Sequence, residues 1–161
     1  MTLEAWHDFF VAQAGASAAL AGLLFVALSI NIASIIKMPW LPPRAAATMV
    51  LLVGALLEAL VALWPRPPLA VFGIEEIVIS GAVWIGIVRN TIAGRNVPKE
   101  LTFVTRMSAV LSQCGSLPAL AGAITLTAGV EAGIYGIAFA MLVSMAIAFF
   151  NSWVLLVEIL R

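Results

Sequence analysis

Five long apolar runs, separated by short polar breaks, constrain this sequence more than any other feature. A helix needs roughly 20 residues to cross the hydrocarbon core of a bilayer, and each run is about that long or longer. We expect helices over residues 9–36, 45–64, 69–88, 105–128 and 132–158. The sequence therefore predicts an all-α membrane protein in which residues 1–161 form one bundle of about five transmembrane helices.

The composition of the chain supports a lipid environment. Hydrophobic residues make up 63% and charged residues 10% of the 161 positions, whereas soluble domains are nearer half apolar and a quarter charged. A soluble core of this size cannot hide so much apolar surface from water. We therefore expect the lipid bilayer to be the main partner of the chain.

The breaks contain residues that end helices. Lys37–Arg44 and Trp64–Pro68 hold three prolines each, and proline cannot continue a helix. Arg89–Arg106 is the longest and most polar break, and Gly129–Gly133 is a short one in which glycine permits a sharp turn.

The basic residues give the bundle a direction. With five spans, one side of the membrane holds only Arg66 and the other side holds seven basic residues. The seven are Lys37, Arg44, Arg89, Arg95, Lys99, Arg106 and Arg161. Because cytoplasmic loops are enriched in Lys and Arg, we predict that the N-terminus lies outside and the C-terminus inside.

Three glutamates lie within the predicted spans, Glu58 in the second and Glu75 and Glu76 in the third. The tight hairpin between these helices brings Glu58 and Glu76 to a similar depth, about 10 Å below the outer boundary at 1.5 Å per residue. Small residues share their helix faces, Gly54 with Glu58 and Gly73 with Glu76. We expect both faces to turn toward protein, and Glu75 to point about 100° away.

A carboxylate at that depth is costly and is a candidate functional group. Two nearby carboxylates do not both ionise easily, so one can hold a proton near neutral pH. This chemistry suits an ion or proton pathway with Glu58, Glu76 and Glu75 as its candidates. The alternative is that Glu75 and Glu76 lie at the outer headgroups, where Arg66 pairs with one of them.

The first helix carries a ridge of small side chains at helical spacing. Its members are Gly15, Ala18, Ala19, Gly22, Ser29 and Ala33. In lipid, small residues let helix backbones approach closely. The ridge predicts either packing within the chain, against the fourth or fifth helix, or an interface with another subunit or a pore lining.

The fourth helix contains Pro118, which frees a backbone carbonyl and kinks the helix. Ser112, Gln113, Ser116 and Thr125 are near enough in sequence to satisfy the freed group. Gln113, Ser116 and Pro118 therefore predict either a kinked helix that lines a cavity or a kink that serves packing.

An internal similarity links two segments. Gln13–Gly22 and Gln113–Gly122 share Gln, Gly, Ala, Leu, Ala and Gly at an offset of 100 residues. Because the predicted topology runs these helices in opposite directions, the similarity indicates either an inverted repeat, as in many transporters, or a coincidence among abundant residue types.

Several function classes are disfavoured. The net charge is zero and there is one cysteine and one histidine, so we expect no nucleic-acid partner, no metal site and no disulfide. The sequence contains no phosphate-binding loop and no nucleophile elbow. We expect no catalytic residues, no cofactor and no enzymatic activity.

The segment from Trp6 to Asn31, followed by Leu41–Ala45, resembles small bacterial polytopic membrane proteins, some of which are labelled as modulators of a membrane AAA protease. The resemblance covers about the first third of the chain. It implies a bacterial inner (plasma) membrane location and transfers no functional residue.

Two functions compete on these observations. The first is an oligomeric channel or carrier for an ion, proton or small solute that uses the intramembrane carboxylates. The second is an accessory or regulatory subunit that packs on a larger membrane complex, for example a membrane protease. The carboxylates favour the first function, and the small-residue ridge favours the second.

Overall fold

A computed structural model describes residues 3–65, 68–99 and 102–160, with side chains described as far as Val154. In chain order it contains η1 (Leu3–Trp6), α1 (His7–Ile30), α2 (Ile32–Ile35), α3 (Leu41–Ala62), α4 (Leu69–Ala93), α5 (Thr102–Thr127) and α6 (Gly133–Leu160). The described residues form no strand, and five helices are long and apolar enough to cross a membrane. The predicted all-α membrane fold is therefore confirmed. Arg66 and Arg161, which entered the charge argument, lie outside the described residues, and the orientation stays a prediction.

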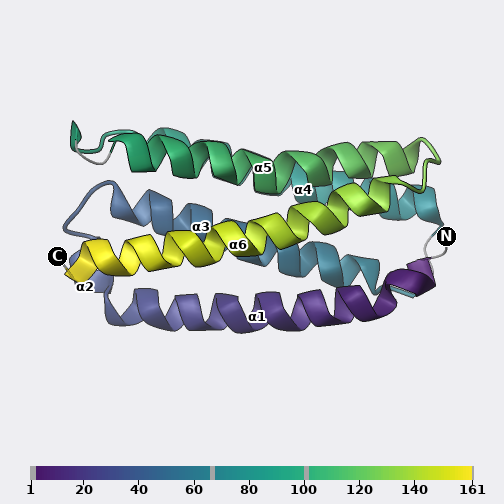
Figure 1. Cartoon of the computed structure of the whole chain (residues 1–161), viewed down its shortest axis with the longest axis horizontal. Helices are drawn as coiled ribbons and strands as arrows, with labels where there is room; N and C mark the ends of the chain where they lie inside the picture. Colours follow the sequence, from purple (N-terminus) through teal and green to yellow (C-terminus); the bar gives the residue numbers. More distant parts are fainter. Residues whose placement is uncertain (1–2, 66–67, 100–101, 161) are drawn as a thin grey trace.

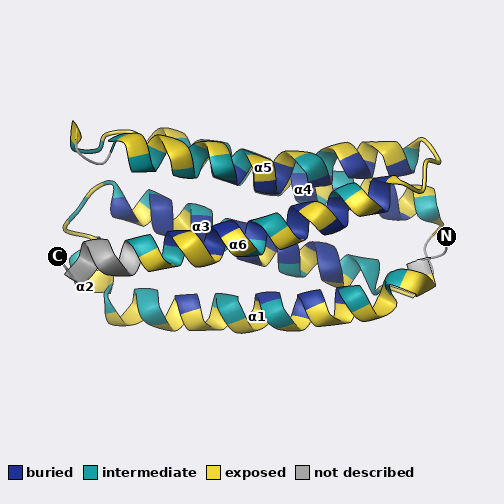
Figure 2. Ribbon diagram, viewed as in Figure 1, coloured by how far each residue is buried: buried dark blue, intermediate teal, exposed yellow. Residues whose placement is uncertain are grey.

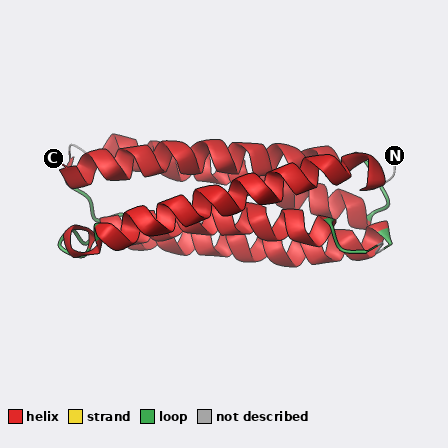
Figure 3. Cartoon of the chain, turned by 90° about the horizontal axis from the view of Figure 1, so that it is seen from below, coloured by secondary structure: helices red, strands yellow, loops and turns green. Residues whose placement is uncertain are grey.

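The long helices run along one axis, with the connections gathered at the two ends (Figures 1 and 3). We call the end at which α1, α4 and α6 begin the N-terminal end, and the opposite end the C-terminal end. Pro42 and Pro43 lie in the first turn of α3, where proline is tolerated because its missing N–H has no partner in a helix anyway. Gly129, with φ of 81°, takes the left-handed conformation that the tight turn between α5 and α6 requires.

Several helix boundaries differ from the sequence prediction: α3 begins at Leu41 rather than at residue 45, and α5 begins at Thr102 rather than at residue 105. Two further differences involve asparagine residues. The third span continues to Ala93 rather than ending at residue 88, and the first is interrupted at Asn31. In both places an asparagine side chain bonds the backbone of its own helix: Asn90 Nδ2 donates to the Gly86 carbonyl at 2.8 Å, and Asn31 Nδ2 donates to the Ala27 carbonyl at 2.9 Å. Asn90, which the sequence analysis placed in a loop, thus belongs to α4 because its side chain bonds a carbonyl of the same helix.

Helices α3, α4, α5 and α6 form a closed ring in which each helix packs against its two neighbours. Helix α1 lies outside this ring and packs almost entirely on α3, with a minor contact to α6. Figure 2 shows the result, with buried positions concentrated where the helices face one another and exposed positions along the outer side of α1. Large apolar side chains such as Phe25, Phe103 and Trp153 are exposed, as expected for surfaces that meet lipid.

Glycines set the distances between ring helices. A Cβ on Gly54 of α3 would meet Val83 of α4, and a Cβ on Gly73 of α4 would meet the backbone of Thr127 and Ala123 of α5. These contacts also fix which residues lie at the same height in neighbouring helices.

Candidate functional site

The two glutamates singled out in the sequence lie inside the protein. Glu58 of α3 is 4% exposed and Glu76 of α4 is 0% exposed, although both belong to helices that cross the bundle. The prediction that their helix faces turn toward protein is confirmed, because Gly54 and Gly73 on those faces are also buried.

The two carboxyl groups lie close together. Gly54 of α3 and Val83 of α4 lie at the same height along the bundle axis. Counted from this pair toward the N-terminal end, at 1.5 Å per residue, Glu76 lies about 4–5 Å beyond Glu58, which is roughly one helical turn. Glu58 and Glu76 are close enough to interact electrostatically, and Glu75 also acts on Glu76 in this way. The structure therefore brings all three predicted glutamates into one electrostatic group.

Glu76 is the least satisfied member of this group. Both of its carboxyl oxygens are buried and neither has a hydrogen-bond partner among the described residues. Glu75 is half-buried, and its Oε2 atom is likewise buried without a hydrogen-bond partner among the described residues. A buried carboxyl group without partners is costly in free energy, which is why such groups are rare outside functional sites. Glu76 is enclosed by helices. The alternative, in which Glu75 and Glu76 lie at the depth of the outer headgroups and Arg66 pairs with one of them, involves a residue outside the described ones and stays a prediction.

An apolar layer lies beside the carboxyl groups toward the C-terminal end. Leu51 of α3 is 1% exposed and Ile87 of α4 is 0% exposed, and both belong to one cluster. A Leu51 methyl carbon lies 3.5 Å from the point that a Cβ on Gly115 of α5 would occupy. Since α3 and α5 are diagonal in the ring, Leu51 extends across its interior.

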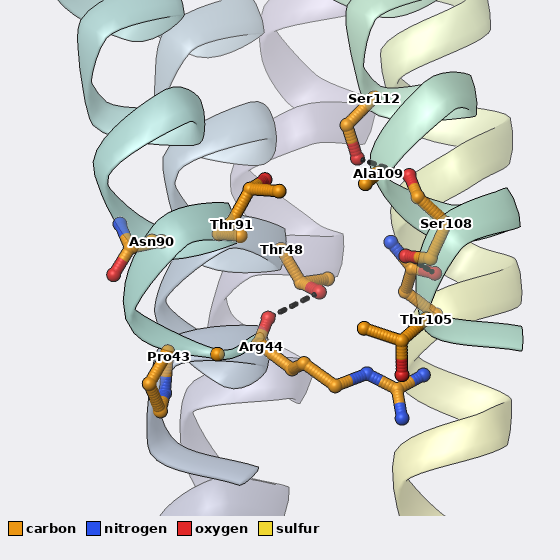
Figure 4. A pocket seen from close by; sticks show the side chains of 12 residues that line it. Pro43, Arg44, Thr48, Asn90, Thr91, Thr105, Ser108, Ala109 and Ser112 are labelled. Atoms are coloured by element: carbon orange, nitrogen blue, oxygen red, sulfur yellow. Dashed lines mark hydrogen bonds between the residues drawn. The ribbon is translucent and has the colours of Figure 1, made fainter. Parts of the chain in front are cut away.

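Beyond this layer, at the C-terminal end, the ring helices line a partly open cavity of about 30 Å³, called the polar cavity below after its polar side chains. Its polar lining is contributed by all four ring helices: Arg44 and Thr48 of α3, Asn90 and Thr91 of α4, Thr105, Ser108 and Ser112 of α5, and Asn151 of α6. Figure 4 shows Arg44 extending from α3 toward Thr105 on α5. Arg44 is only 9% exposed, so its side chain belongs to the interior of the ring.

The sequence analysis missed this cavity, because it placed Arg44 in a polar break at the membrane interface. Two residue spacings in the sequence could have indicated the cavity. Arg44 and Thr48 are four residues apart, and so are Ser108 and Ser112, which puts each pair on one helix face. The structure adds a bond from Ser112 Oγ to the Ser108 carbonyl at 2.8 Å.

The small-residue ridge of α1 does not pack within the chain. Gly15, Ala18, Ala19, Gly22, Ser29 and Ala33 are all exposed. A Cβ added to Gly15 or Gly22 would meet nothing within 4 Å. Packing of the ridge against the fourth or fifth helix, one of the two interpretations above, is therefore wrong: α1 uses its opposite face, with Phe10, Gln13 and Leu24, to contact the bundle.

Helix α5, which contains Pro118, divides its candidate residues between two surroundings. Gln113 does not line the cavity; its Oε1 atom accepts a hydrogen bond from Trp84 Nε1 at 2.9 Å. Ser116 is buried and donates to the Ser112 carbonyl at 3.2 Å. A Cβ on Gly136 of α6 would lie 3.0 Å from the Pro118 carbonyl oxygen. Close packing on α6 thus occurs at the proline, whereas the cavity lies farther along α5.

The two similar segments have different environments. Gly115 and Gly122 are buried against α6, whereas Gly15 and Gly22 are exposed. Gln13 is buried and donates to Ser17 Oγ at 3.2 Å and to Met145 Sδ at 2.8 Å. The described structure therefore gives the repeated residues no equivalent roles.

No protein-family model matches the chain, and comparison with curated proteins and with solved structures gives no match.

Proposed function

We propose that this protein is a membrane channel or carrier for a proton, a small cation or a small solute, with Glu58 and Glu76 as the groups that bind the transported species. The observation that carries the proposal is the fully buried Glu76, whose two carboxyl oxygens have no hydrogen-bond partner among the described residues. Such a group is costly to keep. A bound proton or cation would supply the missing interaction.

The neighbouring glutamates strengthen this proposal. Glu58 is buried about one helical turn from Glu76 along the bundle axis and interacts electrostatically with it, as does Glu75. Carboxyl groups that share a water-poor interior are disfavoured as a doubly charged pair. A proton or small cation bound between Glu58 and Glu76 removes this repulsion. When it leaves, the repulsion between the two carboxylates returns, so the site can bind and release the transported species.

We place the route of the transported species along the axis of the ring of α3–α6. On α4, Ser80 follows Glu76 by one turn and is 0% exposed. On α5, the buried Ser116 and Ser112 lead toward the polar cavity at the C-terminal end. Leu51 and Ile87 close the route in the described form. Transport in this proposal requires the apolar layer to open.

A proteoliposome flux assay tests the proposal. The double variant Glu58→Gln with Glu76→Gln keeps size and polarity but removes both titratable groups. We expect its proton or cation flux to be at least tenfold lower than that of wild type, measured with an internal pH dye under an imposed potential. Glu4→Gln is the matched control, because it removes an identical charge from an exposed side chain in η1, outside the glutamate group. It should retain most of the flux. Equal flux in wild type and the double variant, or no flux in either, contradicts the proposal.

A second candidate function is that of an accessory or regulatory subunit of a larger membrane complex, and the exposed ridge of α1 favours it. Gly115 and Gly122 on α5 have the same spacing as Gly15 and Gly22 on α1, and they receive a neighbouring helix, α6. A helix from another subunit, or from a second copy of this chain, would fit α1 in the same way.

A gentle detergent extract on a sizing column separates these cases. Co-elution with a larger protein supports the accessory role, a homo-oligomer supports self-association through α1, and a monomer contradicts both. In either function we place the protein in a bacterial inner membrane with its N-terminus outside, on the charge distribution and the resemblance described above.

A further inference from the structure

The surroundings of Glu76 limit what can bind to its carboxyl group. Glu76 is 0% exposed, and both of its carboxyl oxygens are buried without a hydrogen-bond partner among the described residues. No space of water size therefore adjoins these oxygens. A cavity needs about 10–15 Å³ to hold one water molecule, so a cation that keeps part of its hydration shell does not fit in the described form, whereas a proton needs no space.

Apolar residues of α5 and α6 lie at the height of Glu76. Gly73, one turn before Glu76 on α4, packs against the backbone of α5 near the end of that helix. Because α5 runs in the opposite direction, Ala119 and Gly122 lie at the height of Glu76, and Gly122 in turn contacts Ile137 of α6. Ala119 and Ile137 are buried. These neighbours offer carbon atoms, and no side-chain oxygen, to a cation.

The neighbours on α3 and α4 are also mostly apolar. Ala59 adjoins Glu58 in the sequence and Phe72 precedes Glu76 by one turn, and both belong to one buried apolar cluster. One turn beyond Glu76, the hydroxyl of Ser80 donates to the Glu76 backbone carbonyl at 2.6 Å. The oxygen donors on these two helix faces are therefore two carboxyl groups and one hydroxyl that is already bonded to the backbone.

This donor set is too small for a metal cation. Ca²⁺ takes about 6–8 oxygen ligands and Mg²⁺ needs a near-octahedral set, and in potassium channels a ring of carbonyl oxygens replaces the hydration shell of K⁺. No group of three or more metal-ligating side chains occurs within the described part of the chain. A proton needs one oxygen, and it makes the carboxyl group neutral, which costs far less free energy in apolar surroundings than a carboxylate.

The charged groups near Glu76 favour the same choice. The described side chains that act on it electrostatically are Glu58 from α3 and Glu75 from its own helix. The described basic residues of the ring helices lie toward the C-terminal end: Arg44, Arg89 and Arg106. Neighbouring carboxylates favour the retention of one proton in the group, because they disfavour a further negative charge.

We infer that the glutamate site binds a proton, held on Glu76 next to Glu58, and excludes metal cations. The inference rests on the proposed function for the role of this site, and it narrows the transported species to protons. Proton binding is measured without transport, so the inference and the proposed function fail separately.

Infrared difference spectroscopy on the full chain in lipid, with buffer flowing over the sample, tests the inference. Between neutral and alkaline N-methylglucamine buffer we expect the C=O band of a protonated carboxyl group. The band should remain when sodium or potassium replaces N-methylglucamine at neutral pH. Glu76→Gln should reduce it at least tenfold, because this variant keeps the size of the side chain and removes the group that holds the proton. Glu4→Gln is the matched control, since Glu4 is exposed in η1, and it should keep the band.

Glu58→Gln keeps the test decisive if Glu76→Gln does not fold. We expect it to shift the band to higher frequency and not to remove it. The proton on Glu76 then lies beside a neutral amide in place of a carboxylate, and hydrogen bonds to charged acceptors are the stronger ones. Loss of the band in Glu58→Gln would place the proton on Glu58 and overturn the assignment to Glu76.

Three further results overturn the inference. The first is the absence of a carboxyl band in folded wild type. The second is a band that disappears when sodium or potassium replaces N-methylglucamine, which would show that a metal cation displaces the proton. The third is a band that persists in Glu76→Gln. A band with all the expected properties, in a protein that gives no flux in proteoliposomes, would support proton binding and contradict the proposed function.

Discussion

Gly122 of α5 and Gly133 of α6 approach each other so closely that a Cβ on either residue would meet the carbonyl oxygen of the other. Backbones at this separation gain van der Waals contact along both helices, which is the main source of helix association in lipid. The pair lies near the turn that joins α5 to α6, and it holds one side of the ring that encloses the glutamates and the polar cavity.

Gly122→Ala should therefore destabilise the protein by about 1–3 kcal/mol, the usual cost of overpacking a tight interior. Thermal unfolding in detergent, followed by circular dichroism, measures the effect. Gly22→Ala is the matched control, because a Cβ there meets nothing within 4 Å and alanine favours helix by up to about 1 kcal/mol. Equal losses of stability in the two variants would show that the contact between α5 and α6 does not form as described.

The burial of Glu76 predicts a conflict between stability and function. Glu76→Met should raise the unfolding temperature, because it removes a carboxyl group whose two oxygens lack partners among the described residues and so removes a penalty of about 1–3 kcal/mol. The same variant should abolish flux in proteoliposomes. Gln13→Met is the contrasting control: Gln13 is also buried, but its amide donates to Ser17, so its loss should lower the unfolding temperature. A drop in unfolding temperature for Glu76→Met would mean that the carboxyl group has a stabilising partner.

The five helices and the inward faces of the glutamates were predictable from the sequence. Apolar length is a local property, and a glutamate flanked on its helix face by a glycine, as Glu58 is by Gly54, indicates a face that meets protein. The exact helix ends were less predictable. The α4 helix passes through Asn90 because its side chain bonds the Gly86 carbonyl, and an apolar scale counts such a residue as a break.

The partners of each helix could not be predicted in the same way. Lipid and a protein core are equally apolar, so the small residues on α1 do not reveal whether Gly22 meets another helix or the bilayer. The polar cavity was missed for a related reason. Arg44 alone resembles an interfacial anchor, and only the assembled ring brings Thr105 and Asn151 to the same cavity.

The exposed ridge of α1 gives a prediction about assembly. Gly22→Leu should leave the unfolding temperature of the protein nearly unchanged in detergent, because nothing within 4 Å meets a side chain there. It should reduce any oligomer or co-purifying complex seen on a sizing column, because a large side chain keeps a second helix at a distance. Gly81→Leu is the control, since Gly81 on α4 is equally open but lies off the ridge. If both variants leave the assembled species intact, the ridge is a lipid-facing surface.

The apolar layer predicts how the route along the ring is closed. Leu51 extends from α3 to within 3.5 Å of the Cβ position of Gly115, so Leu51→Ala should shorten the barrier between the glutamates and the polar cavity. We expect its proteoliposome flux to exceed that of wild type by at least threefold. Leu52→Ala is the matched control: Leu52 is equally buried at 1% and points about 100° away on the helix. Both truncations should lower the free energy of unfolding by a similar amount, about 2–5 kcal/mol. A flux increase seen only in Leu51→Ala would therefore come from a weaker apolar barrier and not from a general loosening of the fold. Equal flux in both variants would place the barrier elsewhere in the ring.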